Sequence, residues 1–417
     1  MEHKISRRKF IGNISAFGLA TSLPLLTQFS NANDLKSPSN KIKIGLIGVG
    51  DRGKKLLLHL LNIEGIQVIA VCDNYGPHYN RAKELTNNKA RAYKDYRNLL
   101  ENKDLDAVVI ATPLHEHAHI TIDCLNAGLH VFCEKSMAKT VKDCEAMVDA
   151  SKSNGKILQI GHQRMFDPKY HKALEMIKSK QLGSINQIRA YWHRNGNWRR
   201  RVPSPDLERK INWRMYREYS LGLMTELASH HLQVANWVYG EAPVAVSGFG
   251  SINHWEDGRE VFDNVNLVYK YPNGKHLIYD SMISNKHYGM EVQVMGNTGT
   301  IEMESGNYYL EKPPPAPGIL QLISDIEKDV FEVVPIGGAS WIPETANKKK
   351  PENYYQKEKD TPSSNTLQFI AFASFIRENK LDNEYLREGY NASVAAILGD
   401  QAMMENRVID IPDNIRL

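Results

Sequence analysis

Apolar and polar positions alternate in two regular ways between residues 41 and 162. Runs of almost purely apolar residues, short enough for strands, alternate with stretches whose apolar residues have helical spacing. The strand-like runs are residues 41–50, 66–73, 107–112, 129–135 and 156–162, and the helical stretches include residues 52–62, 117–128 and 140–155. Apolar strands that alternate with helices predict a parallel sheet covered by helices on both faces.

The pattern changes after about residue 165. The later strands are longer, with polar residues at alternate positions, and the segment YPNGK at residues 271–275 is typical of a hairpin turn. We therefore expect one α/β domain over residues 41–162 and a second over residues 163–417, built on a large, open, mostly antiparallel sheet. Within it, residues 311–362 resemble a surface insertion and residues 366–406 closing helices.

The N-terminus has the features of an export signal. The segment SRRKFIGN contains the pair Arg7 and Arg8, a weakly hydrophobic stretch follows to about Leu26, and SNA forms a small-x-small cleavage pattern. The order of these parts predicts a twin-arginine signal over residues 1–32 and a periplasmic or otherwise exported protein. The stretch is too short and too rich in glycine and serine for a membrane span. A disordered basic tail is the alternative.

Composition and charge exclude several classes of protein. The chain has 417 residues, 24% of them charged, with a net charge of only +4 and no long basic run, so nucleic acid is not expected as the partner. The four cysteines form no CxxC pair, which removes the zinc-ribbon and thioredoxin interpretations. We expect no metal site and free, buried cysteines.

A glycine-rich turn follows the first predicted strand. The segment GVGDRG places Gly48, Gly50 and Gly53 in the G-x-G-x-x-G spacing, with a helix directly after it. Such glycines allow a tight turn, a close approach to a pyrophosphate and close helix packing, so the pattern predicts a Rossmann-type domain that binds NAD. Asp51 and Arg52 lie inside the turn and are expected to contact the cofactor. A glycine turn in another kind of α/β protein is the alternative.

Other residues at the ends of strands are candidates for the same site. Asp73 ends the second strand and suits the ribose hydroxyls of NAD, whereas it would repel the 2′-phosphate of NADP. Loops at the carboxyl ends of parallel strands line the ligand crevice. The further candidates for the cofactor site are Thr112, His117, Glu134, Lys135 and His162. For His117, a place at the start of a surface helix is equally compatible with the sequence.

Three longer motifs together resemble the family of glucose-fructose oxidoreductase, inositol dehydrogenase and MocA. They are GLIGVGDRG, IATPLHEHAHITIDCLNAGLHVFCEKSMAKTV and GLMTELASHHLQVANW, and the resemblance covers most of residues 41–310 and the closing helices. It implies a nucleotide-binding domain, and a second domain whose open sheet carries contacts between copies in a homo-oligomer. It also implies NAD(P)-dependent oxidation or reduction of a secondary alcohol of a sugar or cyclitol. One branch of the family instead cleaves glycosides through a transient oxidation.

The resemblance assigns the candidate catalytic residues. The family's E-K-P element corresponds here to Glu134, Lys135 and Ser136, so the catalytic lysine is present and the proline is absent. The family's Asp-x-Gly-x-His element corresponds to residues 226–230, with Glu226 in place of the aspartate and His230 in place of the catalytic histidine.

These residue types suit the oxidation of an alcohol. A neutral histidine can remove the hydroxyl proton, and a fixed ammonium can stabilise the oxygen as its charge grows. Glu226, one helical turn before His230, is expected to orient the imidazole or to bind a substrate hydroxyl. The alternatives are a solvated Lys135 and a packed His230.

The stretch YWHRNGNWRRRVPSP is the candidate substrate site. Trp192 and Trp198 offer flat faces for sugar rings, and Arg194 and Arg199 offer forks that suit a carboxylate or sulfate. Arg200 and Arg201 extend the same run of arginines. The pattern therefore suggests an acidic carbohydrate, and a solvated basic loop or an oligomer contact is the alternative.

Together these features predict an exported NAD-dependent oxidoreductase. Its substrate would be a saccharide or glycoside from polysaccharide degradation, oxidised at a ring secondary alcohol. The first alternative is an NAD-dependent glycoside hydrolase that works through a transient keto-sugar. The second is an NAD-bound sensor or structural protein without catalytic activity.

Overall fold

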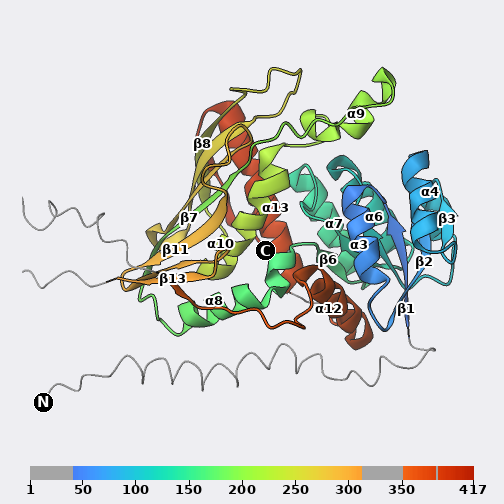
Figure 1. The fold of residues 1–417 in the computed structure, drawn as a ribbon, viewed down its shortest axis with the longest axis horizontal. Helices are drawn as coiled ribbons and strands as arrows, with labels where there is room; N and C mark the ends of the chain where they lie inside the picture. Colours follow the sequence, from blue (N-terminus) through green and yellow to red (C-terminus); the bar gives the residue numbers. More distant parts are fainter. Residues whose placement is uncertain (1–40, 312–350, 382–383) are drawn as a thin grey trace, which may run out of the picture.

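The computed structural model describes residues 41–311, 351–381 and 384–417. The predicted signal at residues 1–32 and most of the predicted insertion at residues 311–362 lie outside these ranges. Two sheets stand side by side in the described part, each with its own helices (Figure 1).

The first sheet is parallel, as predicted. In the described residues it has six strands in the order β3-β2-β1-β4-β5-β6. Its strands are β1 Ile42–Ile47, β2 Ile66–Cys72, β3 Arg91–Tyr93, β4 Ala107–Ile110, β5 His130–Cys133 and β6 Leu158–Ile160. The chain winds outward in one direction from β1 and in the other from β4, so the switch point between β1 and β4 marks the ligand crevice of such a fold.

Helices cover both faces of this sheet (Figure 1). They are α3 Asp51–Leu60, α4 Gly76–Leu85, α5 Tyr96–Leu100, α6 His117–Asn126 and α7 Val141–Asn154. The ends of α7 are those that the sequence predicts, because the side chain of Thr140 accepts a hydrogen bond from the backbone of Asp143 and Gly155 ends the helix at φ 58°.

The second sheet is mostly antiparallel, which also confirms the prediction. Its described strands follow the order β14-β13-β12-β11-β7-β10-β9-β8-β15. They are β7 Ile185–His193, β8 Ala245–Ser251, β9 Asn264–Lys270, β10 His276–Met282, β11 Met290–Gly296, β12 Gly299–Glu302, β13 Asn307–Leu310, β14 Glu352–Asn353 and β15 Ile409–Asp410. The predicted turn joins β9 to β10, and β10 also pairs in parallel with β7.

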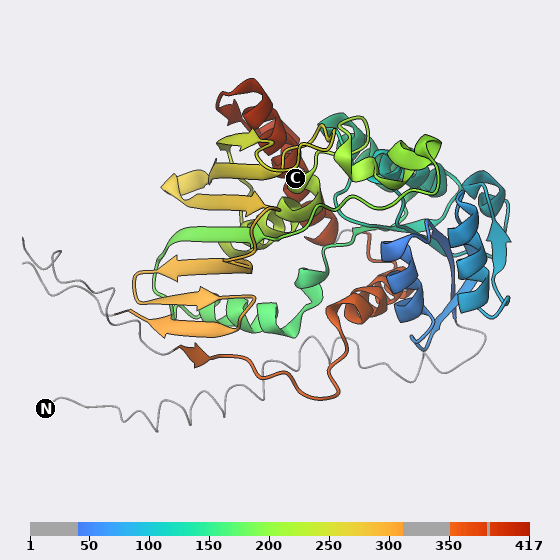
Figure 2. The ribbon, with the colours of Figure 1, turned by 45° about the horizontal axis from the view of Figure 1, so that its top comes forward.

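The remaining helices are α8 Pro168–Lys178, α9 Glu208–Ile211, α10 Ser229–Tyr239, α12 Ser364–Glu378 and α13 Glu384–Glu405. Short 3-10 turns occur at Leu114–Glu116, Gln163–Phe166, Pro205–Leu207, Trp213–Met215, Pro272–Gly274 and Asp413–Ile415, and a π-helical turn occurs at Met224–Ala228. Helices α10 and α13 lie against one face of the large sheet, and among the residues that the structure describes no helix covers the other face (Figure 2). Among the described helices, none combines the length and apolarity needed to cross a bilayer.

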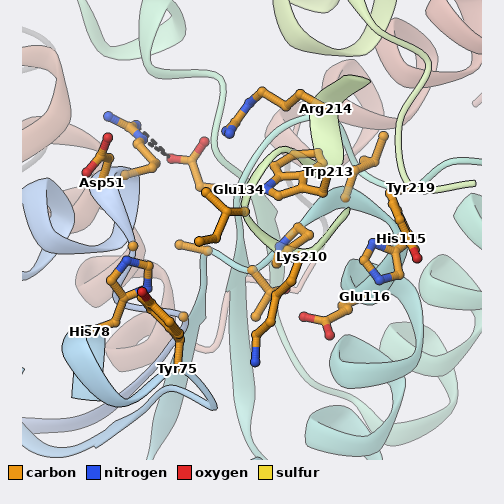
Figure 3. Close-up of a pocket in the computed structure, with 18 of the residues that line it drawn as sticks. Asp51, Tyr75, His78, His115, Glu116, Glu134, Lys210, Trp213, Arg214 and Tyr219 are labelled. Carbon is orange, nitrogen blue, oxygen red and sulfur yellow. Dashed lines mark hydrogen bonds and ion pairs between the residues drawn. The ribbon is translucent and has the colours of Figure 1, made fainter. Parts of the chain in front are cut away.

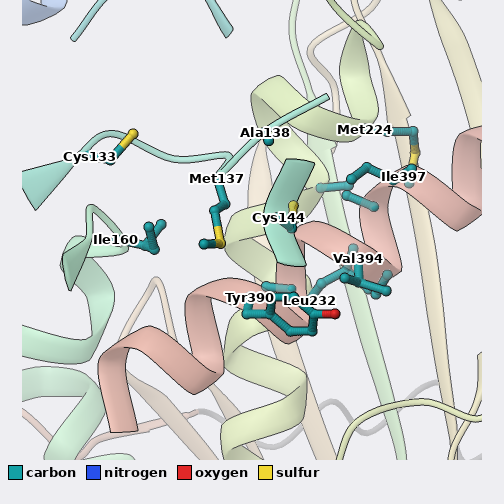
Figure 4. Packing of buried hydrophobic residues seen from close by; sticks show 14 of the residues in the cluster. Cys133, Met137, Ala138, Cys144, Ile160, Met224, Leu232, Tyr390, Val394 and Ile397 are labelled. Carbon is teal, nitrogen blue, oxygen red and sulfur yellow. The ribbon is translucent and has the colours of Figure 1, made fainter. Parts of the chain in front are cut away.

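The C-terminal helices join the two halves of the molecule. Although α12 follows the large sheet in sequence, Phe369 and Phe372 pack on Phe132 of β5, with ring centroids 4.7 and 5.9 Å apart. Helix α13 packs so closely on β6 that a Cβ on Gly389 would lie 2.5 Å from the Cβ of Ile160. Figure 4 shows residues of α7 and α13 in this shared core, where Cys144 of α7 lies near Tyr390 and Val394 of α13. All four cysteines are buried and free, as expected.

Candidate active site

A cavity of about 1380 Å³ lies between the two halves, at the carboxyl ends of β1, β4 and β5. It extends from the glycine turn to His230, and both domains line it. Figure 3 shows its central part, with Asp51, Glu134, Trp213 and Arg214 projecting into the same space. A cleft of this size, lined by charged and aromatic side chains from two domains, is the usual setting of an active site.

The glycine turn leaves no room for side chains. Gly48 has φ 86°, and a Cβ there would lie 2.7 Å from the backbone of Ala111. A Cβ on Gly53 would lie 1.9 Å from the carbonyl oxygen of Gly48. Gly50 precedes the first turn of α3, whose free N–H groups point to the cavity end of the helix. The shape is therefore a backbone cradle of the kind that holds a diphosphate.

Asp73 is held in place at the other side of this cradle. Its carboxylate accepts hydrogen bonds from the backbone N–H groups of Val49 and Tyr75, at 2.7 and 2.8 Å. Nδ1 of His78 lies 3.3 Å from the same carboxylate. Each carboxylate oxygen has two lone pairs, so acceptor positions remain for ribose hydroxyls. The cradle and this carboxylate fit NAD.

The charged residues of the turn have partners within the protein. The guanidinium of Arg52 lies 2.6 Å from the buried carboxylate of Glu134, and that of Arg200 lies 2.7 Å from Asp51. Glu134 and Arg52 thus link β5 to α3 across the cavity (Figure 3). The predicted contacts of Asp51 and Arg52 with the cofactor stay predictions, and both side chains line the cavity.

Lys135 is bound by the π-helical turn. Its Nζ donates hydrogen bonds to the carbonyl oxygens of Thr225 and Glu226, at 3.2 and 3.0 Å. An ammonium has three N–H donors, so one remains for the cavity. Burial lowers the pKa of Lys135, and the neighbouring carboxylates of Glu226 and Glu134 oppose that change. These two hydrogen bonds fix the orientation of the Nζ group, so Lys135 differs from a solvated surface lysine.

Ser136 replaces the family's proline without opening the turn. The peptide bond between Lys135 and Ser136 is cis, a geometry that is far more common before proline. The hydroxyl of Ser136 donates to the carbonyl of Thr225 at 2.9 Å. The serine therefore adds a third hydrogen bond between this loop and the π-helical turn.

His117 holds the same loop from behind. Its Nδ1 lies 2.8 Å from the carbonyl oxygen of Ser136 and its Nε2 lies 3.1 Å from that of Thr112. Both ring nitrogens thus face the backbone, which gives His117 a positioning role; His117 also lines the cavity, and its predicted contact with the cofactor stays a prediction. The hydroxyl of Thr112 is buried and has no hydrogen-bond partner among the described residues, so it stays available to a ligand.

Glu226 has a different partner from the one expected. Its carboxylate accepts a hydrogen bond from Nε of Arg214 at 2.7 Å, and no bond to the imidazole of His230 is present in the described residues. Burial would raise the pKa of Glu226, but the charges of Arg214 and Lys135 outweigh it and hold that pKa below its usual value. Glu226 is therefore an anion beside Lys135, and the expectation that it orients His230 is not met.

His230 is buried in a group of aromatic rings at the end of the cavity. It is 6% exposed, and its ring lies 5.8 Å from that of Trp192 and 5.8 Å from that of His162. Burial, the charge of Arg164 and the charge of Lys135 hold the pKa of His230 well below its ordinary value. The imidazole is therefore neutral at physiological pH, as a general base requires.

His162 lies deeper than the other candidates for the cofactor site. Its side chain is only 1% exposed and is not among the described residues that line the cavity. It lies between the end of β6 and the 3-10 turn Gln163–Phe166, and its ring packs edge-on against that of His230. Its predicted contact with the cofactor stays a prediction.

The candidate substrate residues differ in whether a carboxylate of the protein already pairs with them. The ring of Trp192 lies between two guanidinium groups, with Arg164 at 5.3 Å and Arg194 at 5.0 Å from its centroid. Trp198 and Arg194 line the cavity, and Arg194 has no ion pair with any described carboxylate. Arg199 instead pairs with Glu208 and Asp257, so it stabilises its own loop and is not free to bind an anion.

Sequence motifs did not indicate several residues of the cavity. Arg214 pairs with Glu226, Trp213 stacks on Arg214 at 4.1 Å, and Tyr75 and His78 form the rim near Asp73 (Figure 3). Arg214 and Trp213 come from a loop without a motif, so only the folded chain brings them to the site. Tyr75 could have been suspected, because it lies just beyond the end of β2. In the described residues, no group of three or more potential ligands is arranged to hold a metal ion.

Comparisons with known proteins agree with this geometry. The family model "Oxidoreductase family, NAD-binding Rossmann fold" matches residues 42–162, and the family model "GFO/IDH/MocA C-terminal domain" matches residues 170–302. The two family models together match more than half of the chain.

Individual proteins are more distant. The chain is 35% identical over 144 residues to inositol 2-dehydrogenase of Salmonella typhimurium, a match that spans 34% of this chain and 43% of that protein. It is 29% identical over 242 residues to alpha-N-acetylgalactosaminidase of Shewanella oneidensis, which spans 47% of this chain and 52% of that protein. The structure of levoglucosan dehydrogenase with NADH has the same fold, with a TM-score of 0.70, 17% identity and coverage of 89% of this chain and 99% of the other. Residues 42–162 are an NAD-binding Rossmann domain, and the chain belongs to the Gfo/Idh/MocA family of oxidoreductases.

Proposed function

We propose that this protein is an NAD-dependent oxidoreductase that acts on a ring secondary alcohol of a saccharide or glycoside. One observation carries the proposal. A half-buried lysine with one free N–H and a neutral histidine line the same cavity as the dinucleotide cradle. The names of two relatives, inositol 2-dehydrogenase and levoglucosan dehydrogenase, support a polyhydroxylated ring as the substrate.

The residues of the site have distinct roles in this proposal. Bound NAD supplies an acceptor for the hydride that leaves the alcohol carbon. His230 takes the hydroxyl proton, which its depressed pKa allows because the imidazole is unprotonated. Lys135 directs its remaining N–H at the alcohol oxygen and stabilises the negative charge that develops there. Glu226 holds Arg214, and its charge opposes the lowering of the Lys135 pKa by burial.

The test is a substrate screen with purified protein. Inositols, neutral sugars, uronates and glycosides are each mixed with NAD, and NADH is followed by its absorbance. We expect NADH to form in equal amount to a keto product with at least one substrate. If no polyol yields NADH while NAD binds normally, the oxidoreductase proposal fails.

A second candidate function is NAD-dependent glycoside hydrolysis through a transient keto-sugar. The resemblance to an alpha-N-acetylgalactosaminidase favours it. In this reaction the cofactor is restored in every cycle, so a glycoside releases its leaving group without net NADH. Measurement of aglycone and NADH in the same sample separates the two functions, because a dehydrogenase yields NADH and a hydrolase yields only free aglycone.

We further propose that the carbohydrate is acidic. Arg194 lies at the substrate end of the cavity beside Trp192 and has no carboxylate partner among the described residues. Burial lowers the pKa of Arg194 from a very high ordinary value, and the guanidinium stays charged at physiological pH. Binding of matched neutral and uronic sugars tests this, and equal affinities would contradict it.

The open face of the large sheet is our proposed contact between copies of the chain. Phe249 and Val268 are 73% and 43% exposed there. The alternation along β9 places Val268 opposite the buried Leu267 and Tyr269, and Phe249 pairs with Asn266 on the same open face. Analytical ultracentrifugation should show an oligomer, and Phe249→Glu should weaken it. If the parent protein and the Phe249→Glu variant are both monomers, this surface is not a contact between copies.

We also propose export by the twin-arginine route, with a role in polysaccharide degradation. The basis is the pair Arg7 and Arg8 and the apolar stretch that follows it. Fractionation of cells that express the full chain tests the proposal. Replacement of both arginines by lysine should keep the protein in the cytoplasm, and an unchanged distribution would contradict export by this route.

A further inference from the structure

A segment of the second domain crosses the cavity to reach the nucleotide-binding domain. We call residues 197–215, which run from Asn197 to Met215, the strap. The strap contains α9, which projects over the nucleotide-binding domain (Figure 1). Many of its residues line the cavity opposite the glycine turn. It therefore forms the wall that faces the dinucleotide cradle.

Two cations of the strap contact the nucleotide-binding domain. Nη2 of Arg200 lies 2.7 Å from Oδ2 of Asp51, in the first turn of α3. Nζ of Lys210 lies 3.4 Å from the carbonyl oxygen of Asn74 and 5.9 Å from the ring centroid of Tyr75. The side chain of Lys210 points into the cavity (Figure 3). One cation thus stands at the diphosphate cradle and the other beside the residue that follows Asp73.

The backbone of Arg200 is held by buried contacts. The side chain of Asn212, which is 2% exposed, accepts from the backbone N–H of Arg200 at 2.7 Å and donates to its carbonyl at 2.9 Å. The neighbouring Arg199 is anchored to Asp257 and Glu208. A loop fixed on both sides in this way presents Arg200 at a defined place.

The charges at the cradle need such a cation. Asp51 places a carboxylate at the helix end where a diphosphate would lie, and two anions repel each other there. Arg52, the nearest cation in sequence, is paired with Glu134. Arg200 is the cation of the described residues that pairs with Asp51, so the balancing charge comes from the other domain.

We propose that Arg200 is a cofactor-binding residue that the second domain supplies, and that it provides the positive charge for the diphosphate of NAD. Lys210 closes the strap over the adenosine end beside Tyr75. Arg200 belongs to the run of arginines that the sequence suggested for an acidic substrate, and the structure assigns it to the cofactor instead. The inference rests on NAD binding and is independent of the reaction that follows.

The test is calorimetric binding to the full chain without substrate, with NAD, ADP-ribose and adenosine as three ligands. Arg200→Ala should weaken NAD and ADP-ribose by roughly tenfold, because a charge-assisted hydrogen bond to a phosphate is lost. It should leave adenosine, which has no phosphate, within about twofold of the parent affinity. Arg81→Ala is the matched control, because Arg81 is an exposed arginine of α4 that does not line the cavity.

Two outcomes would overturn the proposal. One is an Arg200→Ala protein with unchanged affinity for ADP-ribose, or with the same loss for all three ligands. The other comes from the double variant Asp51→Asn with Arg200→Ala, in which the loss should persist. Full recovery there would mean that Arg200 only neutralises Asp51 and does not serve the diphosphate.

Lys210 is tested by the rate of cofactor release. Lys210→Met should speed the release of NADH severalfold in stopped-flow fluorescence, because the strap loses its contact with Asn74 and Tyr75. Arg209→Ala is the control from the same helix, since Arg209 pairs with Glu218 and Glu260 of its own domain. Equal acceleration by both variants, or none by Lys210→Met, would contradict closure by Lys210.

Discussion

At the scale of single residues, the site depends on how each charge is held. Two N–H groups of the Lys135 ammonium donate to backbone carbonyls, and the third has no such partner. Glu134 and Glu226 are each paired with an arginine. Neither carboxylate therefore occupies the third N–H of the lysine. The result is a cation with a fixed direction, which can stabilise charge at one point of the cavity without reorganisation.

Replacement of Lys135 by methionine should lower kcat on the order of 10² to 10³-fold. NAD affinity should change little, because the cradle is built from Gly48, Gly50 and Asp73. Lys139→Met is the control, since Nζ of Lys139 also donates to two carbonyls, those of Arg217 and Glu218, away from His230. Steady-state kinetics and calorimetry measure both effects, and a similar kcat loss in the two variants would contradict a special role for Lys135.

Buried histidines should make the protein less stable in mild acid. Burial lowers the pKa of His162 and that of His231 from 6.5 to about 3. Between those values the unfolded chain binds protons that the folded protein does not, so stability is full above pH 6.5 and falls below it. Each of these histidines contributes a slope of about 1.4 kcal/mol per pH unit.

Urea unfolding between about pH 7 and pH 5 measures this slope. His231→Asn should reduce the slope of the unfolding free energy against pH by about 1.4 kcal/mol per pH unit, the contribution of one proton. His287→Asn, which alters an exposed histidine, is the control. An unchanged slope in His231→Asn would show that His231 is protonated in the folded protein.

At the scale of elements, two irregular turns build the site. The π-helical turn Met224–Ala228 brings the carbonyls of Thr225 and Glu226 to Lys135, and its wider winding is a feature that often occurs at functional sites. The glycine turn brings α3 against β1 so closely that only hydrogen atoms fit between them. In each turn an irregular backbone places backbone groups at the site: carbonyl oxygens in the π-helical turn and the close-packed chain in the glycine turn.

Gly53→Ala should disrupt the cradle. The new Cβ would lie 1.9 Å from the carbonyl oxygen of Gly48, and because that oxygen belongs to the backbone, the turn itself must shift. We expect a loss of about 1–3 kcal/mol in unfolding free energy and a clear loss of NAD affinity. Gly76→Ala in α4 is the control, because a Cβ on Gly76 would meet open space. If Gly53→Ala binds NAD as the parent protein does, the cradle is not where NAD lies.

At the scale of the whole molecule, the last helices unite the two domains. Helix α12 completes the core of the nucleotide-binding domain with Phe369 and Phe372, and α13 spans from β6 to the large sheet. The cavity between the domains is therefore bordered by elements that are far apart in sequence and packed together. The relative position of Lys135 and His230 depends on this packing.

Phe369→Ala should lower the unfolding free energy by about 3–5 kcal/mol, because a fully buried ring is lost from the contact with Phe132. Glu378→Ala at the exposed end of the same helix is the control, and it should change stability by less than about 0.5 kcal/mol. Denaturant unfolding measures both. An equal small effect in the two variants would mean that α12 contributes little to the first domain.

Much of the architecture could be predicted from local pattern. The parallel order of the first sheet follows from apolar strands that alternate with helices, and the ends of α7 follow from Thr140 and Gly155. The cradle follows from three glycines at a fixed spacing, because no Cβ fits at Gly48 or at Gly53. Lys135 is a candidate catalytic residue because it matches the lysine of the family's E-K-P element at the end of a strand.

The sequence by itself therefore determined the fold class and the cofactor cradle, because these depend on spacing within a few tens of residues. The candidates for the catalytic residues rest on the resemblance to the family. Only the tertiary structure decided which charges pair. In the folded chain Glu226 pairs with Arg214, Arg199 pairs with Asp257, and Arg200 pairs with Asp51. The fold also buries His162 and turns both ring nitrogens of His117 to the backbone. An ion pair forms only where the fold brings two side chains within a few ångströms of each other. A local sequence pattern does not predict which distant residues meet in this way.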